Sequence, residues 1–183
     1  MDTRRLIWLD LEMTGLDPRS DEIIEIATVV TDDQLDILAK GPSLVIGQTS
    51  ARLEQMDDWN QTHHRRSGLY EAVLASSMTV QEAELETLVF LKRYAKAGMS
   101  PLCGNSICQD KQFLARYMPN LLKFLHYRMV DVTSFKLGFH MWCNQVPPFK
   151  KSESNHRAME DVCQSIEECR YYQKYFRQCS HDD

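Results

Sequence analysis

The connections between the first three predicted strands are short, and this feature constrains the fold more than any other in the chain. Residues 5–12 and 23–31 are rich in Leu, Ile and Val, which is typical of strands. A third strand is expected over residues 35–46, and only Asp32 and Asp33 provide the turn before it. Parallel neighbours need a crossover of about a dozen residues or more, so these strands must pair antiparallel. The first part of the chain is therefore predicted to form an antiparallel meander.

Helices and short strands are expected to alternate along the rest of the chain. The capping box Thr79-Val-Gln-Glu82 predicts a helix that begins there and ends at Gly98. The turn-forming pair Gly41-Pro42 is expected to interrupt the third strand. Further helices are expected over residues 107–117, 134–142 and about 157–177, and further strands over residues 101–104 and 127–132. The pattern predicts an α/β fold with a mixed five-stranded sheet, its first three strands antiparallel, flanked by helices. No linker divides the chain, so we expect a single domain over residues 1–183.

Composition excludes several classes of protein. Apolar residues make up 43% and charged residues 26% of the chain, which is typical of a globular domain and not of a disordered one. No apolar run approaches the about 20 residues that span a bilayer, and the one near the N-terminus is too short for a signal-peptide core. We therefore expect a cytoplasmic protein without a membrane segment. The net charge of −5 argues against a long basic track for nucleic acid, but not against a short nucleic-acid substrate at an acidic metal site.

Asp10 and Glu12 are the most informative residues, because they lie two positions apart in a predicted apolar strand. Both side chains project from one face of the strand, whereas Ile7, Leu9 and Leu11 cover the opposite face. Burial and mutual repulsion both oppose the ionisation of two such carboxylates, so a positive charge must offset them. The alternative is a pair of edge-strand carboxylates that point into water, which the apolar residues on both sides disfavour.

Three further residues could join this pair. Asp110 and Asp161 each lie near the start of a predicted helix. Either one alone could be a first-turn acid favoured by the helix dipole. His156 precedes Asp161 by five residues, which places it in the loop before the last helix, where it could lean over a site that Asp161 enters. A capping or surface histidine is the alternative.

Together the four carboxylates predict a metal centre. Oxygen ligands from Asp and Glu suit Mg²⁺ or Mn²⁺ rather than zinc. Two such ions can stabilise both the attacking and the leaving oxygen in a phosphoryl displacement. A histidine with an ordinary pKa near 6.5 could take the proton from the attacking water. We therefore expect two divalent metal ions, Mg²⁺ or Mn²⁺, as cofactors.

Three segments resemble the motifs of the DEDDh 3′→5′ exonuclease family. They are Asp10-Leu-Glu12-Met-Thr-Gly, then Gly104-Asn-Ser leading to Asp110, and His156-x-x-x-x-Asp161. The resemblance covers nearly the whole chain, and it is to those members that remove nucleotides from the 3′ ends of very short RNAs, down to dinucleotides. It implies a ribonuclease-H-like fold, in agreement with the expected order of strands.

The resemblance implies a role for each member of these motifs. Two divalent ions would be held by four carboxylates: Asp10, Glu12, Asp110 and Asp161. His156 would act as the general base, and each cleavage would release a 5′-mononucleotide.

The resemblance also implies contacts to short single-stranded RNA. Leu16 would be an apolar wedge against the bases and Trp59 the aromatic that stacks on a base; a core leucine and an ordinary helix tryptophan are the alternatives. The substrate's far phosphate would be capped by Ser106, Arg128 and Thr133, although the family more often has serine at the last position. Such a cap would explain a preference for very short RNA.

The family forms homodimers, which implies a homodimer here in which His64 and Tyr127 reach the partner's site. Two other functions stay open. One is a DEDDh exonuclease of the proofreading or tRNA-trimming type that acts on longer RNA or DNA 3′ ends, which the negative net charge disfavours. The other is a non-catalytic nucleotide-binding module, which the complete set of catalytic residue types disfavours.

Overall fold

The strands form one mixed sheet in the order β3-β2-β1-β4-β5. A computed structural model of the chain describes residues 5–143, 146–151 and 157–178. The strands are β1 Leu6–Met13, β2 Ile23–Thr31, β3 Ile37–Val45, β4 Pro101–Gly104 and β5 His126–Asp131. β1 pairs antiparallel with β2 and β2 with β3, whereas β4 runs parallel to both β1 and β5. The predicted mixed sheet with an antiparallel first trio is confirmed.

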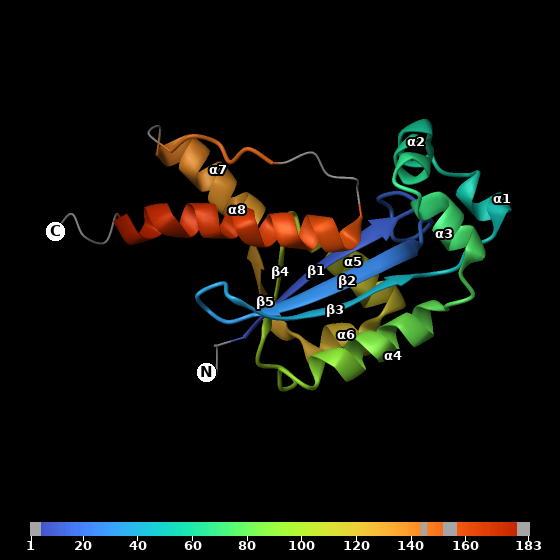
Figure 1. The fold of residues 1–183 in the computed structure, drawn as a ribbon, viewed down its shortest axis with the longest axis horizontal. Coiled ribbons are helices and arrows are strands. Elements are labelled where there is room, and N and C mark those ends of the chain that lie inside the picture. Colours follow the sequence, from blue (N-terminus) through green and yellow to red (C-terminus); the bar gives the residue numbers. More distant parts are fainter. Residues whose placement is uncertain (1–4, 144–145, 152–156, 179–183) are drawn as a thin grey trace.

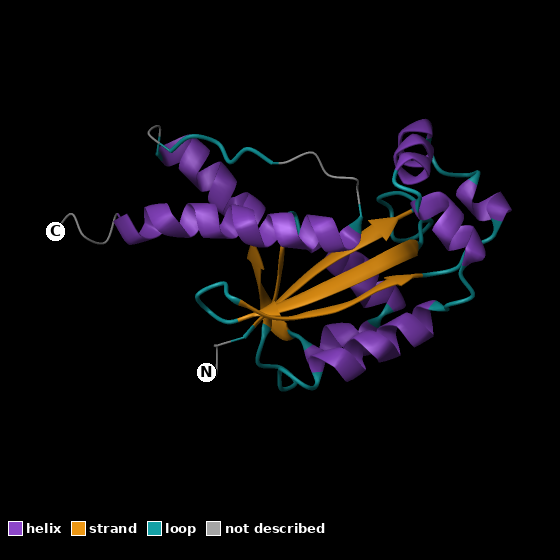
Figure 2. Cartoon of the chain, viewed as in Figure 1, coloured by secondary structure: helices purple, strands orange, loops and turns teal. Residues whose placement is uncertain are grey.

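Helices cover both faces of this sheet, as Figure 1 and Figure 2 show. The helices are α1 Ser50–Leu53, α2 Asp58–Arg66, α3 Leu69–Ala75, α4 Val80–Leu91, α5 Cys108–Tyr117, α6 Pro119–Phe124, α7 Val132–Trp142 and α8 Ala158–Gln178. α8 packs on β1 and β2 from one face, with α7 against it, and α4, α5 and α6 pack on the other face. α1, α2 and α3 gather beyond the end of β1. Among the described helices, none has the length and apolar character needed to cross a membrane.

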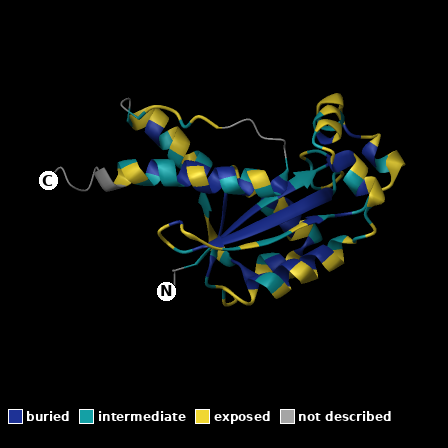
Figure 3. Cartoon of the chain, viewed as in Figure 1, coloured by how far each residue is buried: buried dark blue, intermediate teal, exposed yellow. Residues whose placement is uncertain are grey.

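Alternation along β1 divides its side chains between two cores. Leu9 and Leu11 pack with residues of α4, α5 and α6, whereas Trp8 packs with residues of α8. β2 is buried along its whole length, and it forms the dark centre of Figure 3. Asp10 and Glu12 continue the face of Trp8, so the fold places both carboxylates in the layer between the sheet and α8.

Two expectations about secondary structure are wrong, although the capping box at Thr79 is confirmed. β3 continues through Gly41 and Pro42, but its pairing with β2 shifts register there, and such a bulge on an edge strand tolerates a proline. Gly41 is needed there, since a Cβ would lie 2.5 Å from Thr28 Oγ1. The helix expected to reach Gly98 ends instead at Leu91 and continues as turns. The short helices α1, α2, α3 and α6 had no counterpart in the sequence pattern.

Candidate active site

Carboxylates from β1 and α8 meet between the sheet and the helix. One oxygen each from Asp10, Glu12 and Asp161 lies within 4.8 Å of the others. The two β1 residues share the α8 face because they alternate with Leu9 and Leu11, and Asp161 enters from the first turn of α8. Three of the four carboxylates predicted to bind metal therefore converge.

The fourth carboxylate, Asp110, lies against the same strand. It is a buried residue in the first turn of α5, and its Oδ1 accepts a hydrogen bond from Leu11 N at 3.0 Å. That N–H has no partner in β4, because β4 pairs with β1 only near the start of β1. The hydrogen bond holds Asp110 beside the strand that carries Asp10 and Glu12.

Burial and mutual repulsion oppose ionisation of this cluster. Burial raises the pKa of Asp10 well above its usual value, and the charges of Asp110 and Glu12 raise it further. Burial, followed by the charge of Asp161, raises the pKa of Glu12 to about 9. Burial also raises the pKa of Asp110 to about 7, despite the hydrogen bond from Leu11 N. The acids therefore cannot all be ionised at neutral pH without added positive charge.

A buried ion pair adjoins the cluster. Glu25 lies directly across from Glu12 in the β1–β2 ladder, and its side chain is fully buried. Its carboxylate accepts hydrogen bonds of 2.7–3.1 Å from Nε and Nη2 of Arg157 and one of 3.1 Å from Ala158 N. Arg157 is thus engaged by Glu25, and burial of Glu12 outweighs the lowering of its pKa by Arg157.

This donor set fits hard divalent cations. All four acids offer oxygen, the ligand that Mg²⁺ and Mn²⁺ prefer. The guanidinium that faces the acids, Arg157, already pairs with Glu25. The raised pKa of Glu12, about 9, indicates that the site lacks the positive charge needed to keep its acids ionised, and bound cations would supply that charge. His156, the predicted general base, lies outside the described residues, and its role stays a prediction.

Two of the three residues predicted to cap a phosphate are in contact. Ser106 Oγ and Thr133 Oγ1 are 3.1 Å apart, and Ser106 N donates to Thr133 Oγ1 at 2.9 Å. Asp131 at the end of β5 joins them, since its Oδ1 accepts from the backbone N of both residues. Arg128, the third residue, is exposed on β5, with its guanidinium carbon 5.3 Å from the centre of the Tyr127 ring.

Leu16 and Trp59 both project outward. Leu16 is 71% exposed, so the alternative of a core leucine is wrong. Its backbone carbonyl accepts a hydrogen bond from Gln109 Nε2 of α5. Trp59 is 58% exposed in α2 and stacks on His63 with ring centroids 3.8 Å apart. Both side chains are as accessible as contacts to RNA bases require.

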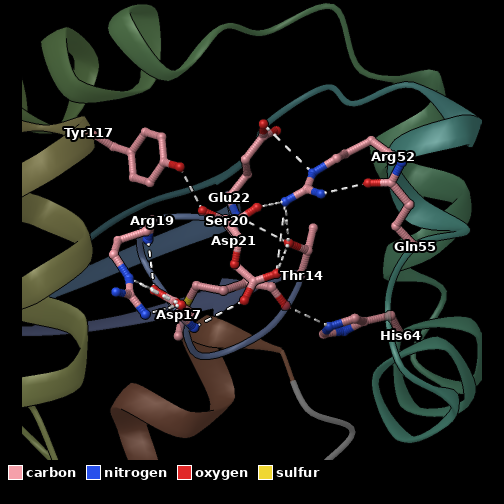
Figure 4. A network of polar contacts seen from close by, with 11 residues as sticks. Thr14, Asp17, Arg19, Ser20, Asp21, Glu22, Arg52, Gln55, His64 and Tyr117 are labelled. Carbon is pink, nitrogen blue, oxygen red and sulfur yellow. Dashed lines mark hydrogen bonds and ion pairs between the residues drawn. The ribbon is translucent and has the colours of Figure 1, made fainter.

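The loop after β1, which carries Leu16, is held by Arg52 of α1, as Figure 4 shows. The guanidinium of Arg52 donates to Ser20 O, and its Nη2 lies 3.8 Å from Asp21 Oδ1. From α5, Tyr117 donates its hydroxyl to Asp21 O at 2.6 Å. Contacts from two helices therefore fix the position of the loop.

His64 and Tyr127 differ in a way that bears on the implied dimer. The side chain of His64 is 2% exposed, and its Nε2 lies 3.1 Å from Met13 O of the same chain (Figure 4). His64 is thus buried within its own chain, and its implied contact to a partner's site stays a prediction. Tyr127 is 72% exposed on β5, which leaves that implication open for it.

Sequence reasoning missed Glu25, Arg157, Asp131 and Arg52. Glu25 offered one signal, a single charge inside the apolar run IIEIATVVT. Its importance follows from its register with Glu12, which no local pattern specifies. The other three are ordinary surface-type residues in the sequence, and only tertiary contacts give them partners.

Comparisons with known proteins show the family of the chain. A family model described as an exonuclease (RNase_T) matches residues 7–169. An oligoribonuclease from Coxiella burnetii is 55% identical over 170 residues, which cover 93% of this chain and 93% of that protein. An oligoribonuclease from Alcanivorax borkumensis is 52% identical over 93% of this chain and 94% of its own length. One from Haemophilus influenzae is 49% identical over 96% of both chains.

Solved structures share the fold. The crystal structure of cell-death related nuclease 4 superposes with a TM-score of 0.65 at 13% identity, over 95% of this chain and 65% of that one. A 3′-exonuclease that recognises the 3′ end of the histone mRNA stem-loop superposes with a TM-score of 0.64 at 15% identity, over 94% of this chain and 64% of that one. The chain thus spans just under two thirds of each solved nuclease, and the predicted ribonuclease-H-like fold is confirmed.

Proposed function

The chain belongs to the exonuclease family whose model matches residues 7–169, and within that family to the oligoribonucleases. From this premise we propose that it degrades very short RNA. It is a 3′→5′ exoribonuclease that hydrolyses short single-stranded RNAs, down to dinucleotides, to 5′-mononucleotides. The observation that carries the proposal is the convergence of Asp10, Glu12 and Asp161 within 4.8 Å, with Asp110 beside them. A binding module would have no need for such a costly cluster of acids.

Two divalent metal ions, Mg²⁺ or Mn²⁺, are proposed as cofactors. Asp10, Glu12 and Asp161 would hold them with oxygens that already converge, and Asp110 would complete the donor set from the first turn of α5. Bound there, the ions supply positive charge for the attacking and leaving oxygens of the scissile phosphodiester.

The first proton transfer falls to a group of this chain. His156 is proposed as the base that takes a proton from water as the water oxygen bonds to phosphorus. The bond from phosphorus to the 3′ oxygen breaks, that oxygen takes a proton from solvent water, and the terminal nucleotide leaves with its 5′ phosphate. His156 directly precedes Arg157, whose bonds to Glu25 anchor the start of α8.

Substrate length is proposed to be set by contacts at both ends of the RNA. Leu16 and Trp59 would contact the bases, each from an exposed position. The phosphate far from the scissile bond would be capped by Ser106, Thr133 and Arg128. The contact of 3.1 Å between the hydroxyls of Ser106 and Thr133 supports this cap.

A homodimer in the cytoplasm is proposed as the working form. Tyr127 of one protomer would reach the partner's site, which its exposed position permits. His64, which lies against the end of β1 in its own chain, is proposed to contribute to the partner's site as well. The whole chain is proposed to form a single exonuclease domain, since the family match covers residues 7–169.

The test compares rates on a dinucleotide, a seven-nucleotide RNA and a long RNA of the same 3′ sequence. The proposal predicts the highest kcat/KM on the dinucleotide and release of 5′-mononucleotides from 3′ ends. Equal rates on the dinucleotide and on long RNA or DNA would favour an exonuclease of the proofreading or tRNA-trimming type. Absence of any cleavage with Mg²⁺ or Mn²⁺ would favour a binding module.

A further inference from the structure

A layer of polar groups, of which Ser165 and Glu168 are buried and Asn105 is half-buried, lies behind the two hydroxyls of Ser106 and Thr133. Asn105, which directly follows β4, is its centre. Its Nδ2 donates to Ser165 Oγ and to Glu168 Oε2 of α8, both at 3.0 Å. Its Oδ1 accepts from Thr133 Oγ1 at 3.4 Å. One amide therefore links the hydroxyl of Thr133 to the middle of α8.

Glu168 is an unusual residue to find at this position. Its side chain is 1% exposed on the sheet-facing side of α8, and a buried carboxylate is costly unless it has partners. Its Oε2 accepts from Asn105 and lies 3.9 Å from Lys151 Nζ, and its Oε1 has no hydrogen-bond partner among the described residues. Asn105 is therefore the group that this buried carboxylate holds at hydrogen-bond distance.

The backbone of Ser106 shows why this support matters. Its φ of 49° is in the left-handed region, which is unfavourable for a residue other than glycine. Such a conformation persists only where surrounding contacts determine it. The N–H of Ser106 meets two acceptors at 2.9 Å, Asp131 Oδ1 and Thr133 Oγ1, and the second of these is the hydroxyl that Asn105 holds.

The same helix also carries an acid of the metal cluster. Asp161 and Glu168 are seven residues apart on α8, which corresponds to about 10.5 Å along the helix axis. A rigid helix thus connects the carboxylates near the scissile bond with the polar layer behind Ser106 and Thr133. Loss of the contact from Asn105 to Glu168 or to Thr133 would therefore alter the position of the Ser106 and Thr133 hydroxyls relative to the metal-site carboxylates.

We propose that Asn105, held by Glu168, is a positioning residue that sets the phosphate cap at the distance from the carboxylates that suits a 5′-phosphorylated dinucleotide. This inference rests on the proposed function and deepens it. Asn105 acts through Thr133 and Ser106, and it confers a preference for a terminal phosphate at that distance without taking part in bond cleavage.

The test measures kcat and KM on a dinucleotide with a 5′ phosphate and on the same dinucleotide with a 5′ hydroxyl. Asn105→Ala and Glu168→Leu should raise KM for the phosphorylated dinucleotide at least about tenfold and reduce the advantage that the phosphate confers. Glu168→Gln keeps an oxygen acceptor for Asn105 and should retain most of that advantage. Glu167→Leu on the exposed side of α8 is the matched control and should leave it unchanged.

The outcomes separate the inference from the function on which it rests. Equal losses on both dinucleotides would mean that Asn105 and Glu168 have only a structural role, and would overturn the inference. An unchanged phosphate advantage in Glu168→Leu would overturn it as well, even where Asn105→Ala fails to fold. If wild-type protein has the same kcat/KM with and without the 5′ phosphate and on short and long RNA, the proposed function itself is contradicted. This measurement requires no variant.

Discussion

Two groups of carboxylates lie on either side of the end of β1, and they differ in what neutralises them. Within β1, Asp10 and Glu12 face α8, and burial raises the pKa of Glu12 to about 9. After the end, Asp17 is exposed enough to pair with Arg19, and the hydrogen bonds from Arg19 lower the pKa of Asp17 to about 2. The same type of side chain therefore has opposite electrostatics within a few residues of sequence.

The partners explain the difference. Asp21 and Glu22 in the loop after β1 each lie within 4 Å of the guanidinium of Arg52, so protein cations balance that group. In the buried group the nearby guanidinium of Arg157 pairs with Glu25 instead. Acids beside the guanidinium of Arg52 hold a loop in place, whereas the converging acids, whose neighbouring Arg157 pairs with Glu25, form a site for an added cation. The two groups differ in what the neighbouring guanidinium binds: Arg52 lies against the acids of the loop, whereas Arg157 pairs with Glu25 beside the cluster.

The largest expected effect comes from removing one acid of the converging cluster. Asp10→Asn should lower kcat on a dinucleotide at least about 1000-fold, equivalent to about 4 kcal/mol, because the donor set for the cations loses a charged ligand. It should leave the thermal midpoint of metal-free protein unchanged or higher, since repulsion within the cluster falls. Steady-state kinetics and circular dichroism check both results. Near-normal cleavage by the variant would remove Asp10 from the site.

Removing the guanidinium of Arg157, which lies beside the converging acids, should mainly affect stability. Arg157→Met leaves Glu25 buried without its partner and should lower the free energy of unfolding by about 3 kcal/mol. The double variant Arg157→Met with Glu25→Gln should recover part of that loss, because no buried charge remains unpaired. Urea denaturation measures both. A single variant as stable as the wild type would show that the pair does not brace α8.

The pH dependence of stability should also distinguish the two groups. Glu12 has a folded pKa of about 9 against a usual value of 4.5, so its contribution to stability is present below pH 4.5 and is lost as the pH rises through 9. In chelator, the thermal midpoint should therefore fall between about pH 5 and pH 9, and excess Mn²⁺ should reduce that fall. Glu12→Gln should make the metal-free profile flatter. A wild-type thermal midpoint that does not change with pH in chelator would contradict the raised pKa of Glu12 and the need for added positive charge.

The smallest effects belong to the paired group. Arg52→Met should destabilise the loop that carries Leu16 and raise KM about fivefold, equivalent to about 1 kcal/mol, with little change in kcat. Arg19→Met, which removes a guanidinium 85% exposed to solvent, should leave both KM and the thermal midpoint unchanged. A large fall in kcat for Arg52→Met would mean that this group takes part in the chemistry after all.

The sequence was most informative where short-range rules decide the structure. Alternation placed Asp10 and Glu12 on one face, and the capping box placed the start of α4 at Thr79. It was least informative where a residue depends on distant partners. Glu25 bonds Arg157 at a separation of 132 residues, and Asn105 bonds Glu168 across 63 residues. The burial of His64 likewise depends on how α2 packs against the end of β1, which no local pattern specifies.

Dinucleotide hydrolysis with and without divalent ions is the most direct test of the central claim, that the converging acids bind the cations that cleavage requires. Purified protein is treated with chelator, and 5′-mononucleotide release is then followed before and after addition of Mg²⁺ or Mn²⁺, with Asp10→Asn as a parallel sample. The account predicts no release in chelator, recovery with either ion in the wild type, and no recovery in the variant. Release that continues in excess chelator would contradict it.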